Sequence, residues 1–528
     1  MEVVTDSGAS ASRFSPSSKS DKGLKSGAIG AVSNVVIGVS STAPAYSLAA
    51  TLGAIVGDQG HRPVRPRRTC RVVPADVVHR AGLLLHESGR SRLWDDLCLV
   101  TRAMGPQLGW LNGWVIVAAD IVVMASLSQI AGTYTFLLFG AHTLADSTPA
   151  VTVVGVGWIV GMVAICIVGV ELNAKTQAIL LGPEVTILTA FAIVSFVKGA
   201  STHPPGYVAP ALAWIDPFQI PSFNALINGV LLGLFIYWGW DAGVAVNEES
   251  RNSASGPGRS AVISTLLLVA VFVVVSYAAQ SYAGPQFLVN NSSDVLNALG
   301  ARTFGSGWDK LLILAVLTSA SASTQTTILP TARTTLSMAR WGAIPKAFGK
   351  VHPRFQTPWV STISFGVVSI VWFVGLEILS KHVLVDSVTG LGFLIAFYYG
   401  FTGLACTIYY RRTLLRSLKN FIFAGILPLL GFLSLSFVFV RAYMNYSQSG
   451  AAASPPLLGI QIPIVIGIGS VLLGLLLVIP SFAAYRGGYF RRRPEAATAN
   501  ALELRPDGQP HLSSDDVPSH HETTRRSR

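Results

Sequence analysis

Long apolar stretches alternate with short polar connections along most of the chain. The stretches long enough to cross about 30 Å of hydrocarbon lie at residues 27–57, 105–139, 149–170, 176–198, 224–247, 260–283, 308–338, 358–380, 384–410, 421–444 and 457–485. A chain inside lipid must satisfy its backbone hydrogen bonds within each segment, so continuous apolar runs of this length predict membrane-spanning helices. The pattern therefore predicts an all-α integral membrane protein with eleven legible spans.

The composition narrows the class of protein. Charged residues make up 12% of the 528 residues and hydrophobic residues 51%, roughly half the charge of an average soluble domain, which excludes an ordinary water-soluble enzyme. The 4 cysteines show no metal-binding spacing, and no nucleotide-binding loop, zinc-protease motif or nucleophile elbow stands in a convincing context. We therefore expect a protein that is not an enzyme, with no cofactor and no metal.

Positive residues are shared unequally between alternate connections, which predicts the orientation of the spans. One side carries 15 of them: Lys175, Arg251, Arg259, Arg340, Lys346, Lys350, Arg354, Arg411, Arg412, Arg416, Lys419, Arg486, Arg491, Arg492 and Arg493. The other side carries 5: Lys198, Arg302, Lys310, Lys381 and Arg441. The N-terminal tail is also basic, so both termini are predicted to be cytoplasmic. The net charge of +12 thus indicates membrane topology rather than a nucleic-acid partner.

Two cytoplasmic termini require an even number of crossings. The eleven spans that can be recognised in the sequence therefore leave one crossing missing. It falls in residues 58–99, where residues 58–98 hold eight Arg, five acidic residues and three His. Each central Arg or Asp costs roughly 2.5–3.5 kcal/mol on insertion scales, so this segment cannot span as written. Either compensating frameshifts have replaced an apolar helix, or the segment is a soluble insertion. The frameshift is favoured, because with a soluble insertion the first helix would enter the membrane in the opposite sense, against the positive charge of the N-terminal tail.

Two spans are interrupted near their middle. The first span would otherwise form a continuous helix, but it is interrupted by Gly38, Ser40, Ser41, Thr42 and Pro44. Backbone groups freed at this depth usually line a cavity, and a second half-helix starting near Pro44 would direct its positive end at an anionic group such as a carboxylate. The alternative is a proline kink with small residues that allow close helix packing.

The second interrupted span is 224–247. Gly233 and Gly239 flank most of an aromatic cluster, and Asp241 follows it. A carboxylate at this depth indicates function, the alternative being a helix-end Asp in a cytoplasmic vestibule. Glu248 and Glu249 are expected to be gate or loop partners. With the missing crossing restored, the two interrupted spans lie five crossings apart, a pattern typical of a transporter site built on inverted repeats.

Several motifs resemble those of the amino acid–polyamine–organocation (APC) permease superfamily. They are Gly38–Ala49, Tyr237–Glu249, the strongest run Ser337–Pro358, and more weakly Ala103–Gly113. The resemblance covers about residues 27–57 and 100–485. It implies twelve helices, the first ten forming a five-plus-five inverted repeat with broken helices 1 and 6. It also implies uptake or exchange of amino acids or related amines.

The resemblance also divides the chain into segments. These are a cytoplasmic N-terminal tail (1–26), broken helix 1 (27–57), the aberrant segment in place of helix 2 (58–99), the rest of the first repeat (100–198), the second repeat (224–410), helices 11 and 12 (421–485) and a disordered cytoplasmic tail (486–528).

Candidate binding residues follow from the same resemblance. The unwound part of helix 1 receives the substrate carboxylate, and the unwound part of helix 6 binds the amine through carbonyls and shapes the pocket with aromatic rings. The matching residues are Ser40, Ser41, Thr42 and Ala43, then Phe235, Tyr237, Trp238 and Gly239. Many members carry a Gly-rich loop in helix 1, whereas this chain has Ser-Ser-Thr-Ala-Pro, which puts the identity of the substrate in question.

Two further acids lie inside spans and are candidates for coupling or gating beside Asp241. Glu184 matches a position where a lysine replaces a sodium ion in some proton-coupled relatives, so protons are the expected coupling ion. The alternative for Glu184 is an interhelical hydrogen bond to Ser319, Ser321, Ser323 or Thr324. Asp120 either completes a polar path or pairs with a neighbouring helix.

These observations predict a secondary-active permease of a bacterial cytoplasmic membrane, working by alternating access, with the lipid bilayer, a small-molecule substrate and protons as partners. Two alternatives stay open. One is a receptor that binds an amino acid without transporting it, and the other is an inactive product of a frameshifted permease gene.

Overall fold

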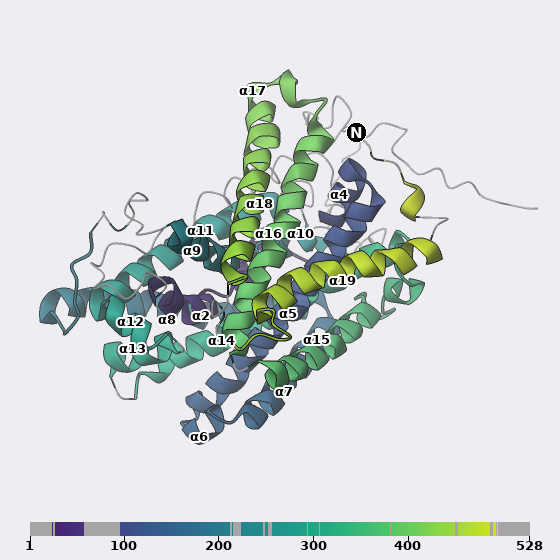
Figure 1. Ribbon diagram of the computed structural model, residues 1–528. Helices are drawn as coiled ribbons and strands as arrows, with labels where there is room; N and C mark the ends of the chain where they lie inside the picture. The colour runs from purple at the N-terminus through teal and green to yellow at the C-terminus, as the bar shows by residue number, and fades with distance from the viewer. Residues whose placement is uncertain are drawn as a thin grey trace, which may run out of the picture.

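The computed structural model describes Leu24 and residues 27–57, 96–211, 214, 223–246, 249–251, 256–292, 294–305, 307–380, 382–448, 452, 454–485, 489–492 and 494. Within these residues the chain is helical, and isolated bridges at Ile29–Ser250 and Leu457–Ile460 are the β-structure found there (Figure 1). Most of the segment 58–99 and most of each predicted tail lie outside the described residues, so the hypotheses about them stay predictions.

The first half of the chain contains seven described helices. They are α1 (Ala31–Thr42), α2 (Pro44–Gly57), α4 (Asp96–Met104), α5 (Pro106–Leu138), α6 (His142–Ala145), α7 (Thr148–Val168) and α8 (Val170–Thr202). The chain between α8 and the next described helix is only partly described.

The second half begins with another divided helix. It contains α9 (Phe223–Ile236), α10 (Ala242–Ala245), α11 (Gly256–Ala283), α12 (Pro285–Asn290), α13 (Val295–Phe304), α14 (Lys310–Arg340), η4 (Lys346–Gly349), α15 (Trp359–Leu379) and α16 (Val383–Tyr410). It ends with η5 (Leu414–Arg416), α17 (Leu418–Asn420), the π-helical turn η6 (Phe421–Ile426), α18 (Leu427–Tyr446), α19 (Ile462–Ala484) and η7 (Tyr489–Arg491).

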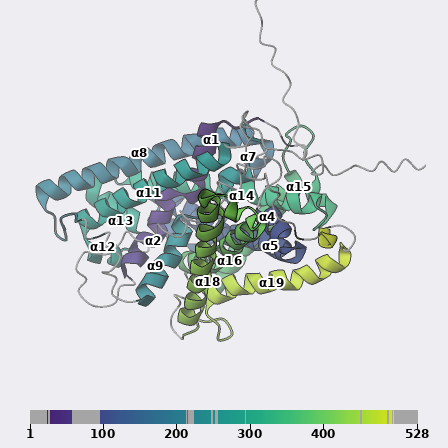
Figure 2. The ribbon, with the colours of Figure 1, turned by 90° about the horizontal axis from the view of Figure 1, so that it is seen from above.

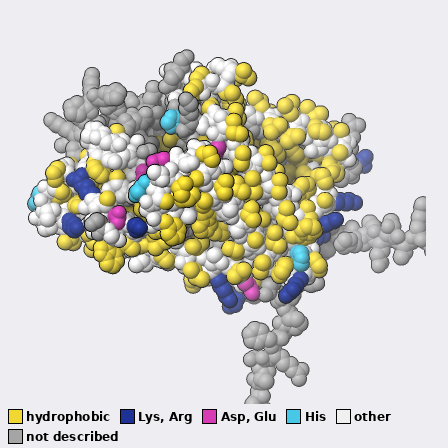
Figure 3. All heavy atoms as spheres, turned by 90° about the horizontal axis from the view of Figure 1, so that it is seen from below, with side chains coloured by type: hydrophobic (Ala, Val, Ile, Leu, Met, Phe, Trp, Pro, Cys, Tyr) yellow, Lys and Arg dark blue, Asp and Glu magenta, His cyan; other side chains and the backbone are white. Residues whose placement is uncertain are grey.

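Ten helical segments of the described chain are long and apolar enough to cross a membrane. The eleventh apolar stretch of the sequence, 224–247, is divided into α9 and α10 and is too short in either part to span alone. Outward faces of the peripheral helices are apolar, with Val153, Ile179 and Leu476 each more than half exposed. In Figure 3 hydrophobic side chains cover most of the described surface on one face, and Lys and Arg lie mainly at its margins. The predicted all-α membrane fold is confirmed.

Three long helices form the centre of the bundle. In Figure 2, α5, α14 and α16 lie in the middle, α8 and α11 run along one side, and α18 and α19 lie along another. Most residues of α5 and α14 are buried, whereas no more than a third of the residues of α7 and α15 are. The two divided helices, α1–α2 and α9–α10, pack against this centre. Both interruptions are therefore placed inside the protein, where neighbouring groups satisfy the freed backbone.

Candidate functional site

The first interruption is a single residue wide. α1 remains helical to Thr42, Ala43 adopts a left-handed conformation (φ 47°, ψ 69°), and Pro44 begins α2. Proline disfavours the helical conformation in the residue before it and has no N–H to continue the hydrogen-bond ladder, which explains the break. Ser40 and Ser41 therefore lie in the last turn of α1 rather than in an unwound segment.

The N-terminus of α2 is bonded to side chains of two other helices. The Ala45 N–H donates to Glu184 Oε1 at 2.9 Å, and the Tyr46 N–H donates to Ser319 Oγ at 3.2 Å. The Ser319 hydroxyl in turn donates to the same Glu184 oxygen at 2.7 Å. Glu184 is fully buried on α8 and places its carboxyl group at the positive end of the α2 dipole. Of the four α14 hydroxyls considered for Glu184, Ser319 makes the bond.

The second interruption lies directly against the first. Gly239, between α9 and α10, has φ of +103°, a conformation that favours glycine. A Cβ atom added to Gly239 would lie 2.6 Å from Ser41 Oγ and 2.9 Å from the Ser41 carbonyl oxygen. Ser323 of α14 donates to that carbonyl at 3.0 Å. The two broken helices are thus in close contact at Gly239 and Ser41, and the hydrogen bond from Ser323 of α14 stabilises this contact.

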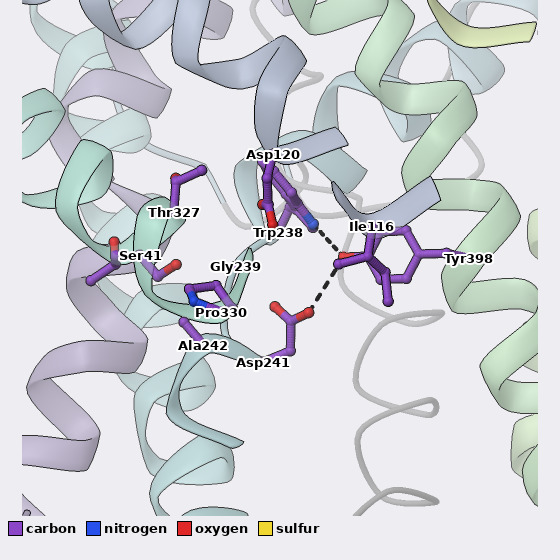
Figure 4. A pocket seen from close by; sticks show the side chains of 11 residues that line it. Ser41, Ile116, Asp120, Trp238, Gly239, Asp241, Ala242, Thr327, Pro330 and Tyr398 are labelled. Carbon is purple, nitrogen blue, oxygen red and sulfur yellow. Dashed lines mark hydrogen bonds between the residues drawn. The ribbon is translucent and has the colours of Figure 1, made fainter. Parts of the chain in front are cut away.

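A small cavity of about 20 Å³ opens at this contact. Figure 4 shows side chains from α1, α5, α14, α16 and the second interruption around it. The lining residues are Ser41, Ile116, Asp120, Trp238, Gly239, Asp241, Ala242, Thr326, Thr327, Pro330 and Tyr398.

One wall of the cavity is a chain of hydrogen bonds from the second interruption to α16. The Trp238 indole N–H donates to the Tyr398 hydroxyl. That hydroxyl donates to Asp241 Oδ2 at 3.4 Å, and the Tyr399 hydroxyl donates to Asp241 Oδ1 at 3.3 Å. Both oxygens of Asp241 are therefore oriented by the tyrosine pair.

The opposite wall carries a second carboxyl group. Asp120 of α5 accepts a hydrogen bond from Thr331 of α14 through Oδ2, at 2.5 Å. Asp120 is 4% exposed, and its other oxygen has no hydrogen-bond partner among the described residues. In Figure 4 the carboxyl groups of Asp120 and Asp241 point toward one another across the cavity. Asp120 thus pairs with a neighbouring helix and also faces the cavity.

The structure brings only some of the predicted binding residues to the cavity. Ser41, Trp238 and Gly239 line it. Phe235 instead packs edge-on against Tyr46, with ring centroids 5.8 Å apart, and Tyr237 packs against Phe272 at 5.4 Å. The Thr42 hydroxyl bonds back to the Val39 carbonyl. Ser40 and Ala43 are buried and do not line it.

Lining residues from α5, α14 and α16 were not predicted. They are Ile116, Thr326, Thr327, Pro330 and Tyr398. Hydroxyl and aromatic residues are common throughout these spans, and the order of residues along the chain does not show which of them face the two breaks. The adjacent Tyr398 and Tyr399 inside an apolar run are the one local signal that could have indicated a polar site.

Many long apolar helices around a central cavity, with two broken helices in contact there, are typical of multi-pass membrane transporters. The family model described as "Amino acid permease" matches residues 97–482. The chain belongs to this family, and the resemblance to the APC superfamily is confirmed.

Curated relatives are similar to this chain at low identity. Cationic amino acid transporter 4, vacuolar, from Arabidopsis thaliana is 25% identical over 303 residues, covering 54% of this chain and 48% of the relative. Branched-chain amino acid permease BcaP of Bacillus subtilis is 27% identical over 188 residues, covering 35% and 38%. Serine/threonine exchanger SteT of the same organism is 22% identical over 262 residues, covering 49% and 56%. The matches to the first relatives span about half of their length.

A solved structure supports the fold. The chain is similar to that in the crystal structure of MhsT in complex with L-phenylalanine, with a TM-score of 0.54 and 14% sequence identity. The similarity covers 78% of this chain and 98% of that one. This similarity is one of fold, and it is consistent with the inverted repeat with broken helices 1 and 6.

Proposed function

We propose that this protein is a secondary-active permease that carries amino acids or related amines across the cytoplasmic membrane by alternating access. The observation that carries the proposal is the contact between Gly239 and Ser41, which joins two broken helices at a cavity in the core. Transporters of this type bind substrate between broken helices and rock one helix bundle around the site.

The ends of the broken helices supply a gate for such a motion. Arg333 of α14 donates through Nε to Glu249 Oε2 at 2.7 Å, and both side chains are buried. The Ile29 N–H, just before α1, donates to the Glu249 carbonyl at 2.9 Å. One cluster therefore ties both broken helices to α14 at the end where the positive-inside pattern predicts the cytoplasm. We propose that these bonds open when the substrate leaves to the cytoplasm.

Proton coupling through Glu184 belongs to the same proposal. Its carboxyl group accepts from the Ala45 N–H and the Ser319 hydroxyl, so it links α8, α2 and α14. Protonation would remove the negative charge that favours the positive end of α2. The bond between α8 and the broken helix would then weaken, which couples protonation to the movement of α2.

The test is uptake by lipid vesicles that contain the purified full chain or a chain with an apolar helix 2 restored. We expect uptake of an amino acid or amine that increases when the outside is more acidic than the inside. Binding without uptake in both preparations would contradict the permease and favour the receptor.

The coupling role is tested by Glu184→Gln. The amide oxygen of Gln can still accept from Ala45, so we expect uptake to continue and to lose its dependence on the proton gradient. Glu171→Gln, at an exposed position of the same helix, should keep that dependence. Unchanged gradient dependence in Glu184→Gln would remove Glu184 from the mechanism while leaving the permease in place.

A further inference from the structure

The connection between α16 and α18 combines positive charge with exposed leucine. Residues 411–420, which we call the basic turn, include η5 and α17 and have the sequence RRTLLRSLKN. In Figure 1 this turn projects beyond the other described helices at the top of the view. Four of its side chains are cationic and exposed: Arg411, Arg412, Arg416 and Lys419.

Acidic residues do not balance this charge. The sequence contains no Asp or Glu between Asp386 and Glu495, a stretch that includes most of α16 and all of α18 and α19. Neither Arg412 nor Lys419 forms an ion pair with a residue that the structure describes. Several positive charges close together attract an anion more strongly than one charge does, so the basic turn favours a negatively charged ligand.

Two leucines of the basic turn are exposed beside these charges. Leu414 packs against the buried cluster that contains Ala405 and Tyr409. Its neighbour Leu415 is 88% exposed, and Leu418 is 73% exposed. Burial of an apolar side chain away from water is favourable, so two leucines presented in this way indicate an apolar partner next to the anion.

The exposed leucines continue the lipid-facing surface of α18. The segment Leu418–Tyr446 is long and apolar enough to cross a membrane. Along it Phe421, Leu430 and Leu433 are 40%, 50% and 52% exposed. The basic turn lies at the end of this segment that the pattern of Lys and Arg predicts to be cytoplasmic. Cationic side chains at such a boundary reach lipid phosphates while neighbouring apolar side chains enter the acyl region.

Hydrogen bonds within the basic turn hold its backbone. The Thr413 hydroxyl donates to the Tyr410 carbonyl at 2.9 Å, and the Asn420 side-chain amide donates to the Thr413 carbonyl at 3.4 Å. The Asn420 N–H donates to the Ser417 hydroxyl at 3.1 Å. The cationic side chains therefore extend from an ordered backbone, which reduces the entropy lost when they bind one ligand together.

We propose that the basic turn binds an anionic phospholipid of the cytoplasmic leaflet. The lipid phosphate lies among the four cationic side chains, and the acyl chains pack on Leu415, Leu418 and Phe421. Anionic lipids are concentrated in this leaflet and are attracted by clustered Lys and Arg next to a membrane segment. The site lies on the surface of the protein and does not depend on the identity of the transported substrate.

Lipid competition tests the proposal. A fluorescent phosphatidylglycerol is bound in a neutral detergent to the purified full chain and to the helix-2-restored chain, and then displaced by unlabelled lipids with matched acyl chains. We expect phosphatidylglycerol to bind at least about tenfold more tightly than phosphatidylcholine, and the difference to fall as salt screens the charges. Equal binding of the two lipids would overturn the proposal.

Paired substitutions locate the site. Arg412→Gln with Lys419→Gln should weaken phosphatidylglycerol binding about twentyfold, roughly fivefold for each charge removed. The matched control is Lys346→Gln with Lys350→Gln, which removes the same charge from exposed positions at η4 and should change binding less than about twofold. Both double variants should unfold at the same temperature. Equal weakening by the two would show attraction to net charge alone and would overturn the site.

A last comparison separates a lipid from a free phosphate. Leu415→Gln with Leu418→Gln keeps every charge and should weaken binding of phosphatidylglycerol, because the acyl chains lose their contact. Inorganic phosphate and glycerol 3-phosphate at millimolar concentration should displace none of the labelled lipid. Displacement by either compound, or unchanged binding by the leucine variant, would show a site for soluble anions and would contradict the lipid.

Discussion

At the scale of single residues, two backbone conformations hold the site together. Ala43 and Gly239 both have positive φ, and each lies at the interruption of a broken helix. Pro44 keeps Ala43 out of the right-handed helical conformation, whereas Gly239 is required because Ser41 Oγ and the Ser41 carbonyl oxygen leave no space for a Cβ atom. The close approach of the two helices therefore depends on the absence of one side chain.

Gly239→Ala tests this dependence. The new Cβ would lie within 3 Å of Ser41 atoms, two of its three nearest neighbours being backbone atoms, in a conformation that is strained for alanine. We expect a loss of about 1–3 kcal/mol of stability and loss of uptake, measured by thermal unfolding in detergent and by vesicle transport. Gly229→Ala in α9, where a Cβ meets nothing within 4 Å, should unfold at the same temperature or slightly higher. Equal behaviour of the two variants would contradict the close contact.

At the scale of elements, the sequence located both interruptions but not the walls around them. Proline and glycine act on the backbone locally, so Pro44 and Gly239 could be recognised without knowledge of the fold. The bond between Glu184 and Ser319 could be predicted as one of several alternatives, because a buried acid needs a hydroxyl nearby and α14 is rich in hydroxyl groups. The positions of Thr327 and Tyr398 depend on how α14 and α16 pack, which local pattern does not contain.

The buried pair of Glu249 and Arg333 gives a prediction at this scale. Removing one partner leaves an uncompensated charge in the core, so Glu249→Gln should cost about 3–5 kcal/mol of stability. The double variant Glu249→Leu with Arg333→Met should lose less, because both charges are removed. Thermal unfolding of the purified chain measures both, with Arg340→Met, an exposed position of α14, as control. A Glu249→Gln variant as stable as this control would show that the pair does not hold the gate.

At the scale of the whole molecule, the family match begins at residue 97, at the end of the charged segment. The structure describes the apolar helix α2 before that segment and the apolar helix α5 after it, with the short helix α4 beginning within its last residues. The parity of the crossings predicts one more helix between them, a conclusion that rests on the Lys and Arg pattern and not on the described residues.

Reading the gene between codons 55 and 102 in all three frames tests the frameshift hypothesis. We expect an alternative frame to encode an aliphatic run of about 20 residues, enough for one crossing. A chain carrying that run should also insert into membranes more completely than the original chain, as measured by resistance to alkaline extraction. Absence of such a run in every frame would favour a true soluble insertion.

The bond from Glu184 to the end of α2 has a consequence for the transport cycle. Because an internal carboxyl group satisfies the α2 N–H groups, the unloaded protein leaves neither the Ala45 nor the Tyr46 N–H without a partner. For the permease proposed above, this bond predicts that the empty carrier returns across the membrane without substrate. We then expect uptake that needs no second substrate on the far side of the membrane.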